Sequence, residues 1–395
     1  MARVVFCWEL GGNYGHITGF ISLAQAFKAR GCEVIFALRN LQHAGLLGDG
    51  VTCVQAPIPN FIPRQRDSYS YSGILAAIGY LDKTVLAGYV AAWQTLLSEY
   101  QADLVIADHA PTAILAAQAL GLPVAAIGTG FVIPPFDSGF PLFTPSLSEP
   151  DVGLDEQLLA NINYAMHQCG GQALRSLGDI FDRAEPYLCT LPELDHYGAR
   201  ADVDYWGPLF SADQGLEPQW PVLSGTRAEA RVFAYLTPKL AHLEQVVTAL
   251  AQLPCAVLLH IPGLSEIQRE AWSTISLRIE AQPVSMRSVL AQATMVVSQG
   301  GMGVSAQCLL AGVRHVIVPT QMEQTMLARR LSDMGLAYAV KADATITDYA
   351  AVFQQALGCE VLANNSQMLA QQYRGFSQDE QIGALVEDML ELLSP

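Results

Sequence analysis

One stretch, residues 295–335, limits what this chain can fold into more than any other. A short apolar segment at 295–298 leads into a glycine turn, helical spacing to Leu310 and a second apolar segment at 315–318. The turn contains three glycines, Gly300, Gly301 and Gly303. Glycines let the backbone approach a ligand closely, and the N–H groups at a helix start favour an anion such as a phosphate. The stretch predicts a strand, an anion-binding turn, a helix and a second strand; a tight turn without a ligand is the alternative.

A similar pattern opens the chain. Residues 3–8 are a continuous apolar run, a glycine loop with His16 and an amphipathic helix follow, and residues 33–38 read as the next strand. Open α/β sheets bind ligands at the carboxyl ends of their strands, where this loop lies. A neutral imidazole, with an ordinary pKa of about 6.5, can accept a proton from a hydroxyl group at neutral pH. His16 is therefore a candidate general base, and a solvated or helix-capping histidine is the alternative.

A third predicted strand, residues 102–108, ends in Asp108. A carboxylate that is bonded to a base histidine fixes its tautomer and stabilises the imidazolium ion. Asp108 is therefore the candidate partner of His16. The alternative for Asp108 is a cap on the helix expected over residues 111–120, and His109 is a rival for either role.

The 395 residues exceed what one hydrophobic core usually serves, so two domains are expected. A net charge of −16 argues against nucleic acid or an anionic membrane surface as the main partner, because both require basic patches. Backbone amides can still hold a phosphate-bearing small ligand. The 8 cysteines are scattered without a C-x-x-C pair, which favours reduced thiols, a cytoplasmic location and no metal site.

Two further patterns bear on membranes. The first residues lack a signal-peptide pattern. The most apolar long stretch, residues 113–135, is interrupted by three glycines and Pro123, so it reads as helix, turn and strand. No integral membrane segment is expected.

Several motifs of the chain resemble those of the UDP-glycosyltransferase family. In residues 295–335 the positions in register are Gly300–Gly301, Ala311–Gly312–Val313, Pro319 and Glu323–Gln324. The opening G-H-I-T-G-F-I-S-L-A-Q-A-F-K-A-R-G-C-E-V-I-F resembles the family's first motif, in which the histidine is the general base. Asp108 stands at the place of the family aspartate that pairs with that histidine. Residues 203–209 resemble the V-G-P-L turn that closes the family's first domain.

Other positions depart from the family pattern. Gln299 stands where the family has a histidine that contacts the donor diphosphate, and Gln307 stands where many members have a ribose-binding glutamate. Val304 falls near the expected hydroxyl residue, and Arg314 replaces a proline. The segment looks like a nucleotide-sugar site whose polar contacts have changed.

The resemblance implies a GT-B architecture, an α/β fold with two doubly wound Rossmann-like domains facing across a cleft. Residues 1–209 would bind the acceptor, 210–229 would be the linker and 230–395 would bind the nucleotide sugar, with the last helix returning to the first domain. The implied reaction is inverting transfer: His16 removes the acceptor proton, Asp108 orients His16, and the glycine turn stabilises the departing nucleoside diphosphate. No cofactor is implied, because the nucleoside-diphosphate sugar is a co-substrate.

The resemblance also implies residues for each substrate. Those for the donor are Thr237, at an expected helix start, and Gln299, Gly300, Gly301, Gly303, Gln307, Glu323 and Gln324. Those for an apolar acceptor are Tyr14, His109, Tyr71 and Trp93. Most aromatic residues between 61 and 100 are expected in the core, and the acceptor role of some of them is a hypothesis.

Two alternatives stay open. A non-catalytic GT-B-like protein that binds a nucleotide or a partner would explain Gln299, Val304 and Gln307 together, although His16 and Asp108 argue against it. A nucleotide-sugar epimerase of similar fold would fit the donor side, but the G-H opening suits an acceptor-using transferase better. The sugar, the nucleobase, the acceptor and the oligomeric state are not determined by the sequence.

Overall fold

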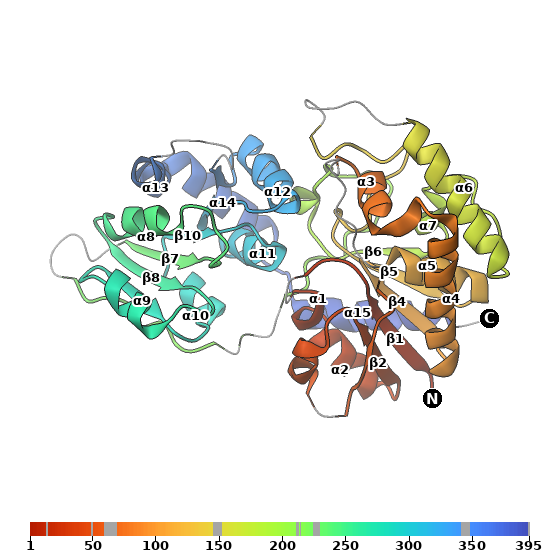
Figure 1. The fold of residues 1–395 in the computed structure, drawn as a ribbon. Coiled ribbons are helices and arrows are strands. Elements are labelled where there is room, and N and C mark those ends of the chain that lie inside the picture. Colours follow the sequence, from red (N-terminus) through yellow and green to blue (C-terminus); the bar gives the residue numbers. More distant parts are fainter. Residues whose placement is uncertain are drawn as a thin grey trace. The chain divides into compact units, whose positions relative to one another are not determined.

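The computed structural model describes residues 1–12, 15–48, 50–58, 69–144, 152–210, 213, 215–223, 230–340 and 348–393. The chain divides into two compact units, the first made of Met1–Ser211 with Ser377–Pro395 and the second of Ala212–Phe376. Each unit contains a six-stranded parallel sheet with helices on both faces (Figure 1). The expected fold class, two doubly wound Rossmann-like domains, is confirmed.

The first sheet has the strand order β3-β2-β1-β4-β5-β6. Its strands are β1 (Arg3–Trp8), β2 (Glu33–Leu38), β3 (Thr52–Gln55), β4 (Leu104–Asp108), β5 (Val124–Gly128) and β6 (Glu185–Leu188). The four central strands are apolar and almost wholly buried, as expected of parallel strands covered on both faces. Because β1 and β4 are neighbours, the winding of the sheet reverses between them. Such a switch point is where open α/β sheets bind ligands.

The helices of the first unit begin and end at recognisable residues. They are α1 (Gly15–Thr18), α2 (Ile21–Ala29), η1 (Leu41–Leu47), α3 (Tyr71–Leu75), η2 (Ala76–Tyr80), α4 (Lys83–Glu99), α5 (Pro111–Leu120), α6 (Val152–Gln168), α7 (Asp179–Asp182), η3 (Pro192–Leu194) and α15 (Gln378–Glu391). The carboxylate of Asp82 caps α4 by accepting hydrogen bonds from the N–H groups of Thr84 and Val85. Helix α5 starts with a proline and ends at Gly121, which has a positive φ of 68°.

The second sheet repeats the plan, with the order β12-β11-β10-β7-β8-β9. Its strands are β7 (Arg231–Tyr235), β8 (Ala256–His260), β9 (Leu277–Glu280), β10 (Met295–Ser298), β11 (Arg314–Ile317) and β12 (Tyr338–Ala339). Its helices are α8 (Leu243–Ala251), α9 (Glu266–Trp272), α10 (Met286–Leu290), α11 (Met302–Ala311), α12 (Met322–Asp333), α13 (Tyr349–Gly358) and α14 (Glu360–Gln372). The switch point of this sheet lies between β7 and β10.

Alternate residues of β7 fill two cores, one on each face of the second sheet. Val232 and Ala234 belong to a buried cluster that includes Phe353 of α13. Phe233, which points the other way, belongs to a cluster with Cys308 of α11. Helix α11 therefore packs on the face of the sheet to which Phe233 points. Its N-terminus follows the carboxyl end of β10.

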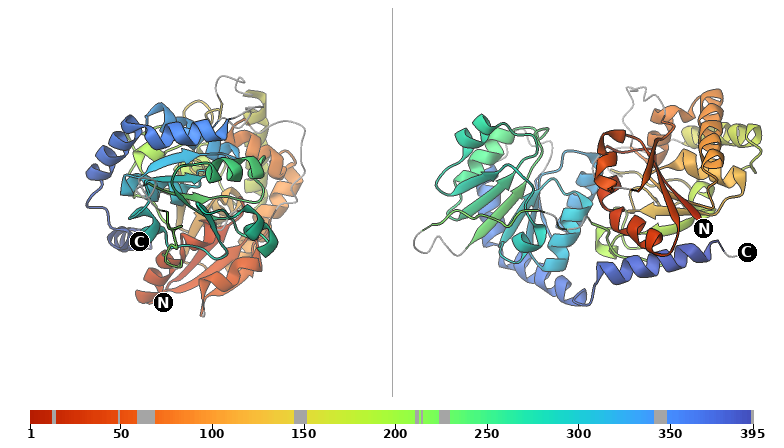
Figure 2. Two further views of the ribbon diagram at one scale, coloured as in Figure 1. Left: turned by 90° about the vertical axis from the view of Figure 1, so that its left-hand side faces the viewer. Right: turned by 90° about the horizontal axis from the view of Figure 1, so that it is seen from below.

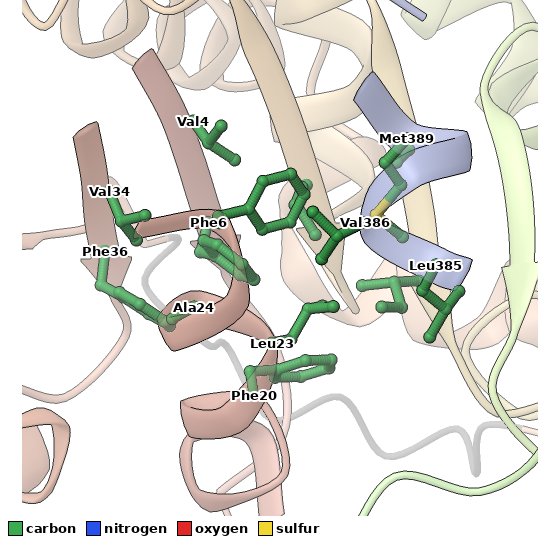
Figure 3. Packing of buried hydrophobic residues seen from close by; sticks show 14 of the residues in the cluster. Val4, Phe6, Phe20, Leu23, Ala24, Val34, Phe36, Leu385, Val386 and Met389 are labelled. Atoms are coloured by element: carbon green, nitrogen blue, oxygen red, sulfur yellow. The ribbon is translucent and has the colours of Figure 1, made fainter. Parts of the chain in front are cut away.

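Helix α15 completes the core of the first unit, although α15 lies far from that unit's other elements in the sequence. Its buried apolar residues are Ile382, Leu385, Val386 and Met389. They pack with Phe6 of β1 and Phe20, which lies just before α2 (Figure 3). Figure 2 shows α15 in dark blue beside α2 in red. The hydroxyl of Tyr187 also donates a hydrogen bond to Asp388, with an O–O distance of 2.6 Å.

Most of the expected elements are present, but one helix start is wrong. The strands at 3–8 and 33–38 and the helix at 111–120 are confirmed. Thr237 does not open a helix, because residues 237–240 form a turn in which the N–H of Leu240 donates to the carbonyl oxygen of Thr237. His242 follows with a positive φ of 58°, and only then does α8 begin, at Leu243.

Asp213 and Leu216 of the expected linker are attached to the second unit, whereas Phe210 is hydrogen-bonded to Gln378 of the first unit. The carboxylate of Asp213 accepts hydrogen bonds from the hydroxyl of Ser285 and from the N–H group of Arg287, at 2.6 and 3.0 Å. The N–H of Leu216 donates to the carbonyl oxygen of Pro283 at 2.9 Å. These contacts hold the segment beside the start of α10.

All 8 cysteines lie among the described residues and are free thiols. Of the described helices, none by itself has the length and apolar character to cross a membrane. One bent pair, Tyr71–Tyr80 with Lys83–Glu99, meets those criteria of length and composition when the two helices are taken together.

Candidate functional site

The first candidate region lies at the switch point of the first sheet. Trp8, the last residue of β1, pairs with Asp108, the last residue of β4, so the segments that follow the two strands start from the same edge. The segment after β1 leads to α1, which contains the backbone of His16. Tyr14 and the side chain of His16 lie outside the described parts of the structure. The segment that leads to His16 thus starts from the same sheet edge as Asp108, and their assignment to one site stays a prediction.

Asp108 is not the N-cap residue of helix α5. The N-cap residue is Ala110, whose side chain makes no capping hydrogen bond. The side chain of Asp108 is buried, with 7% exposed, at the end of β4. The capping alternative for Asp108 is therefore not what the structure shows, and its role beside His16 stays a prediction.

Glu9 supplies the cap instead, and the sequence analysis did not single it out. Its Oε2 accepts from the N–H of Thr112 at 2.9 Å, and its Oε1 accepts from the Thr112 hydroxyl at 2.6 Å. The side chain is 1% exposed, and burial raises the pKa of Glu9 to about 7. A charged residue directly after an apolar strand was the signal that could have drawn attention to it.

The turn after β4 has an unusual backbone. His109 has a positive φ of 45°, which is uncommon for a residue with a side chain. Its carbonyl oxygen accepts a hydrogen bond from the N–H of Leu10 at 3.0 Å, so the segments that follow β1 and β4 are tied together. The ring of Tyr71 lies 6.1 Å from the ring of His109.

Tyr71 belongs to an aromatic cluster at this end of the sheet. Its ring lies 5.2 Å from Phe140 and 5.5 Å from Phe181. Tyr71 is fully buried, and within the described residues its hydroxyl has no hydrogen-bond partner. Burial raises the pKa of Tyr71 well above its usual value, and the nearby carboxyl groups of Glu9 and Asp108 add to this effect. The structure therefore places Tyr71 near His109, the residue that follows the candidate catalytic aspartate.

Trp93 is placed differently. It lies on α4, a helix that contacts α5 and α6, and its side chain is fully buried. This position favours a role in the core. An acceptor contact by Trp93 stays a prediction.

The second candidate region is the glycine turn after β10. Gly300 has a φ of 83°, and a Cβ at this position would lie 2.6 Å from Cγ2 of Ile317. Glycine is required here both by conformation and by space. Gly301 is the N-cap of α11 and has no side chain that could accept from the first N–H groups of the helix. This geometry suits an anion.

A buried polar pair lies behind the turn. The hydroxyl oxygen of Ser298 accepts from the N–H of Gly300 at 3.0 Å and lies 2.9 Å from Nε2 of His315 on β11. Burial lowers the pKa of His315 to about 3, so the ring is neutral at physiological pH. The pair joins the carboxyl end of β10 to His315 within β11 and supports the turn. A strand at His315 was expected from the sequence, but its contact with Ser298 was not.

Gln299 precedes the turn and is 9% exposed. Its Nε2 group is buried and has no hydrogen-bond acceptor in the part of the chain that the structure describes. A buried donor without an acceptor is costly in a folded protein, and a ligand oxygen could accept that bond. Gln299, which departs from the family motif, thus has a buried donor without an acceptor among the described residues.

The other candidates for donor binding lie in segments that follow neighbouring strands of the second sheet. Tyr235, Ser298 and Ile317 lie side by side in the register of β7, β10 and β11, so the segments beyond them start from one sheet edge. Thr237 follows β7, and Glu323 and Gln324 lie in the first turn of α12, after β11.

Two of these candidates already have hydrogen bonds within the second unit. The Oε1 of Gln324 accepts from the N–H and the hydroxyl of Thr320, at 2.8 and 2.9 Å, and so shapes the loop before α12. The Nε2 of Gln307 donates to the carbonyl oxygen of Gly303 at 3.1 Å. Their sugar and ribose contacts stay predictions.

Comparisons with known proteins agree with this arrangement. No family model matches the chain. The PGL/p-HBAD biosynthesis rhamnosyltransferase of Mycobacterium tuberculosis (strain CDC 1551 / Oshkosh) is 26% identical over 348 residues, which cover 82% of this chain and 73% of that protein. A PGL/p-HBAD biosynthesis glycosyltransferase of the same species (strain ATCC 25177 / H37Ra) is 25% identical over 71% of this chain and 69% of its own length.

Solved structures share the whole fold. The glycosyltransferase SnogD from Streptomyces nogalater superposes with a TM-score of 0.62 at 18% identity, covering 98% of this chain and 99% of that one. The glycosyltransferase VinC, solved in complex with DTDP, superposes with a TM-score of 0.67 at 16% identity over 99% of each chain. The chain has the GT-B fold and is similar in sequence to glycosyltransferases. The expected class of enzyme, a nucleotide-sugar-dependent glycosyltransferase, is confirmed, and the comparisons do not favour the non-catalytic or the epimerase alternative.

Proposed function

We propose that this UDP-glycosyltransferase-like protein moves a sugar, with inversion, from a nucleoside-diphosphate sugar to a hydroxyl group of an apolar small-molecule or lipid-like acceptor. The observation that carries the proposal is the turn after β10. There a required glycine, a helix start with glycine at its N-cap and the buried amide of Gln299 converge at the switch point of the second sheet. These are the features that a diphosphate needs.

On the donor side, the N–H groups at the start of α11 face the diphosphate and stabilise the charge that develops as it leaves. The Nε2 of Gln299 donates to a phosphate oxygen. Thr237 provides a hydroxyl group near the phosphates, and Glu323 and Gln324 hold sugar hydroxyl groups. The Ser298 and His315 pair keeps the turn in place.

On the acceptor side, His16 is the base and Asp108 orients it. The acceptor oxygen forms a bond to the anomeric carbon while the bond from that carbon to the diphosphate oxygen breaks. The acceptor proton passes to His16 and the electron pair of the broken bond leaves with the diphosphate. Because the attack comes from the side opposite the leaving group, the anomeric configuration inverts. Tyr71 and His109, with Tyr14 and Trp93, are assigned to the acceptor.

The names of similar proteins guide the choice of substrates. One relative is described as a rhamnosyltransferase, and a spinosyn rhamnosyltransferase of the same fold was solved with a spinosyn aglycone, a TM-score of 0.65 and 17% identity. VinC and SsfS6 were solved with thymidine diphosphate. Thymidine and uridine diphosphates are therefore the first nucleotides to compare, and the protein is proposed to need no cofactor.

The test is binding of these two nucleotides, measured by calorimetry and by thermal unfolding, to the wild type and to Gln299→Glu. The substitution keeps the shape of the side chain but replaces a donor with a negative charge beside a phosphate, so the Kd is expected to rise roughly tenfold or more. Gln299→His is expected to keep or tighten binding. Gln367→Glu, on an exposed position of α14, is the matched control and should leave the Kd unchanged.

Ligand at roughly 100 times its Kd adds about 2.7 kcal/mol to the free energy of unfolding, which thermal unfolding detects easily. If neither nucleotide binds the wild type, the donor proposal is wrong. If Gln299→Glu binds as tightly as the wild type, Gln299 does not face the diphosphate and the assumed alignment of the motif has to be abandoned.

A further inference from the structure

We propose that Glu9 is a positioning residue for the transfer reaction, because its carboxylate fixes the turn between β4 and α5 that carries Asp108 and His109. The inference rests on the proposed function, which assigns Asp108 to the reaction.

Glu9 joins three elements at the switch point of the first sheet. It directly follows β1, and its two carboxyl oxygens accept hydrogen bonds from the N–H and the hydroxyl of Thr112 on α5, at 2.9 and 2.6 Å. The backbone N–H of Ala113 also acts to lower the pKa of the same carboxyl group. The backbone carbonyl oxygen of Glu9 accepts a hydrogen bond from Nη1 of Arg39, just beyond β2, at 2.6 Å. One residue therefore connects the ends of β1 and β2 with the start of α5.

The turn that these contacts hold is short. Only His109 and Ala110 separate the last residue of β4 from the first residue of α5. The strand end is held by the pairing of Trp8 with Asp108, and the carbonyl oxygen of His109 is held by the N–H of Leu10. With so few residues in between, a shift of the helix start moves Asp108 and His109.

The chemistry of the helix start favours a carboxylate in particular. The first N–H groups of a helix lack partners within the helix, and Ala110 at the N-cap has no side chain that could accept from them. The helix dipole further favours a negative charge at this end. Glutamine has almost the same shape as glutamate, but its –NH2 group cannot accept a hydrogen bond from an N–H group. Glu9→Gln therefore removes the negative charge and one of the two acceptor oxygens with little change in volume.

Several ionisable groups interact electrostatically with Glu9, so the pH of the experiment described below has to be chosen with them in mind. They are Cys7 on β1, Arg39 beyond β2, Tyr71 on α3 and Tyr80 on η2. The hydroxyl of Tyr80 lies 2.9 Å from the hydroxyl of Thr112 and so extends the hydrogen-bonded chain. Because burial raises the pKa of Glu9 to about 7, measurements at about pH 8.5 keep most of its carboxyl groups ionised.

The experiment compares the full-length wild type with Glu9→Gln and Glu33→Gln. Glu33 is a matched control, because it lies at the opposite end of the same sheet, half-exposed, in an ion pair with Arg3. Amide hydrogen exchange reports on the turn without any need for activity, and steady-state kinetics report on the reaction. For Glu9→Gln, exchange of the Leu10, Thr112 and Ala113 amides should accelerate.

The same variant should lose roughly tenfold to a hundredfold in kcat, because small displacements of reacting groups have effects of this size. Its KM for the nucleotide sugar should stay within about twofold, since the assigned donor residues lie in the second unit. Thr112→Val, which removes the hydroxyl bonds to Glu9 and Tyr80 but keeps the N–H bond to Glu9, should show a smaller loss of the same kind. This variant tests the proposal if Glu9→Gln does not fold. Glu33→Gln should change none of these quantities.

The proposal is overturned if exchange of these amides is unchanged, or if exchange accelerates while kcat stays at the wild-type value. It is also overturned if the donor KM rises together with the loss of kcat, since that pattern indicates general damage to the fold. A wild type that transfers no sugar refutes the proposed function itself. In that case the exchange data still decide whether Glu9 holds the turn, so the two failures are distinguished.

Discussion

Gly300 has no room for a methyl group. A Cβ at this position would lie 2.6 Å from Cγ2 of Ile317, and its φ of 83° is one that residues with side chains rarely adopt. At the adjacent Gly301 the situation is the opposite, because a Cβ would meet nothing within 4 Å and φ is −62°. Position 300 thus requires glycine, whereas position 301 of the same turn has space for a Cβ.

This difference predicts unequal costs in stability. Gly300→Ala should lower the free energy of unfolding of the second unit by about 1–3 kcal/mol, because both backbone strain and a steric clash are introduced. Gly301→Ala should change it by less than about 0.5 kcal/mol. Urea unfolding followed by circular dichroism measures both values, and equal costs would show that the turn has another conformation.

At the scale of single elements, the turn between β10 and α11 depends on two strands. Ser298 at the end of β10 receives the N–H of Gly300 and contacts His315 on the neighbouring β11. Ser305, further along in α11, is equally buried, but its hydroxyl has no hydrogen-bond partner among the residues described. The two serines form a natural pair for a comparison.

Ser298→Ala should therefore destabilise the protein by about 1–3 kcal/mol, since it leaves a buried N–H group and a buried imidazole without their partner. Ser305→Ala should be neutral or stabilising, because it removes a hydroxyl group that forms no bond. Chemical unfolding of both variants gives the comparison. Similar losses for the two serines would argue against a supporting role for the Ser298 and His315 pair.

The elements themselves were largely predictable from the sequence, whereas contacts between them were not. Apolar runs and glycine punctuation marked β1, β2, β10 and α11, because such patterns are local properties of the chain. The bonds of Glu9 to Thr112 and of Ser298 to His315 join residues on different elements, and no local pattern reveals them. The start of α8 was misplaced, because a turn beginning at Thr237 looks like a helix start in sequence.

The candidate site divides in the same way. The glycine turn and Asp108 were placed by motif and strand order, and the structure puts each at a switch point. Burial decided what sequence could not: Trp93 is fully enclosed, and Gln299 has a buried amide without an acceptor in the described residues. Burial depends on the whole fold, so aromatic spacing alone could not separate core residues from contact residues.

At the scale of the whole molecule, the two units share one strand order, and the first of them is built from two distant parts of the chain. Met389 of α15 is fully buried in the first unit's core. Met368 on α14 is 57% exposed. The same residue type thus occurs in two very different settings.

Met389→Ala should lower the free energy of unfolding of the first unit by about 2–5 kcal/mol, the usual cost of emptying a buried methionine site. Met368→Ala should cost less than about 0.5 kcal/mol. Urea titration followed by tryptophan fluorescence, which Trp8, Trp93 and Trp206 of the first unit report, measures the effect. A small effect of Met389→Ala would mean that α15 is dispensable for this core.

The return of α15 also sets the order of events during translation. The ribosome must synthesise the whole second unit before residues 382–389 emerge, which takes on the order of ten to thirty seconds at ordinary elongation rates. During that interval the nascent first unit exposes the apolar surface that α15 later covers. The second unit has all of its sequence available earlier, so it can mature first, and the amino-terminal half of the protein is the part that depends on chaperones while it waits.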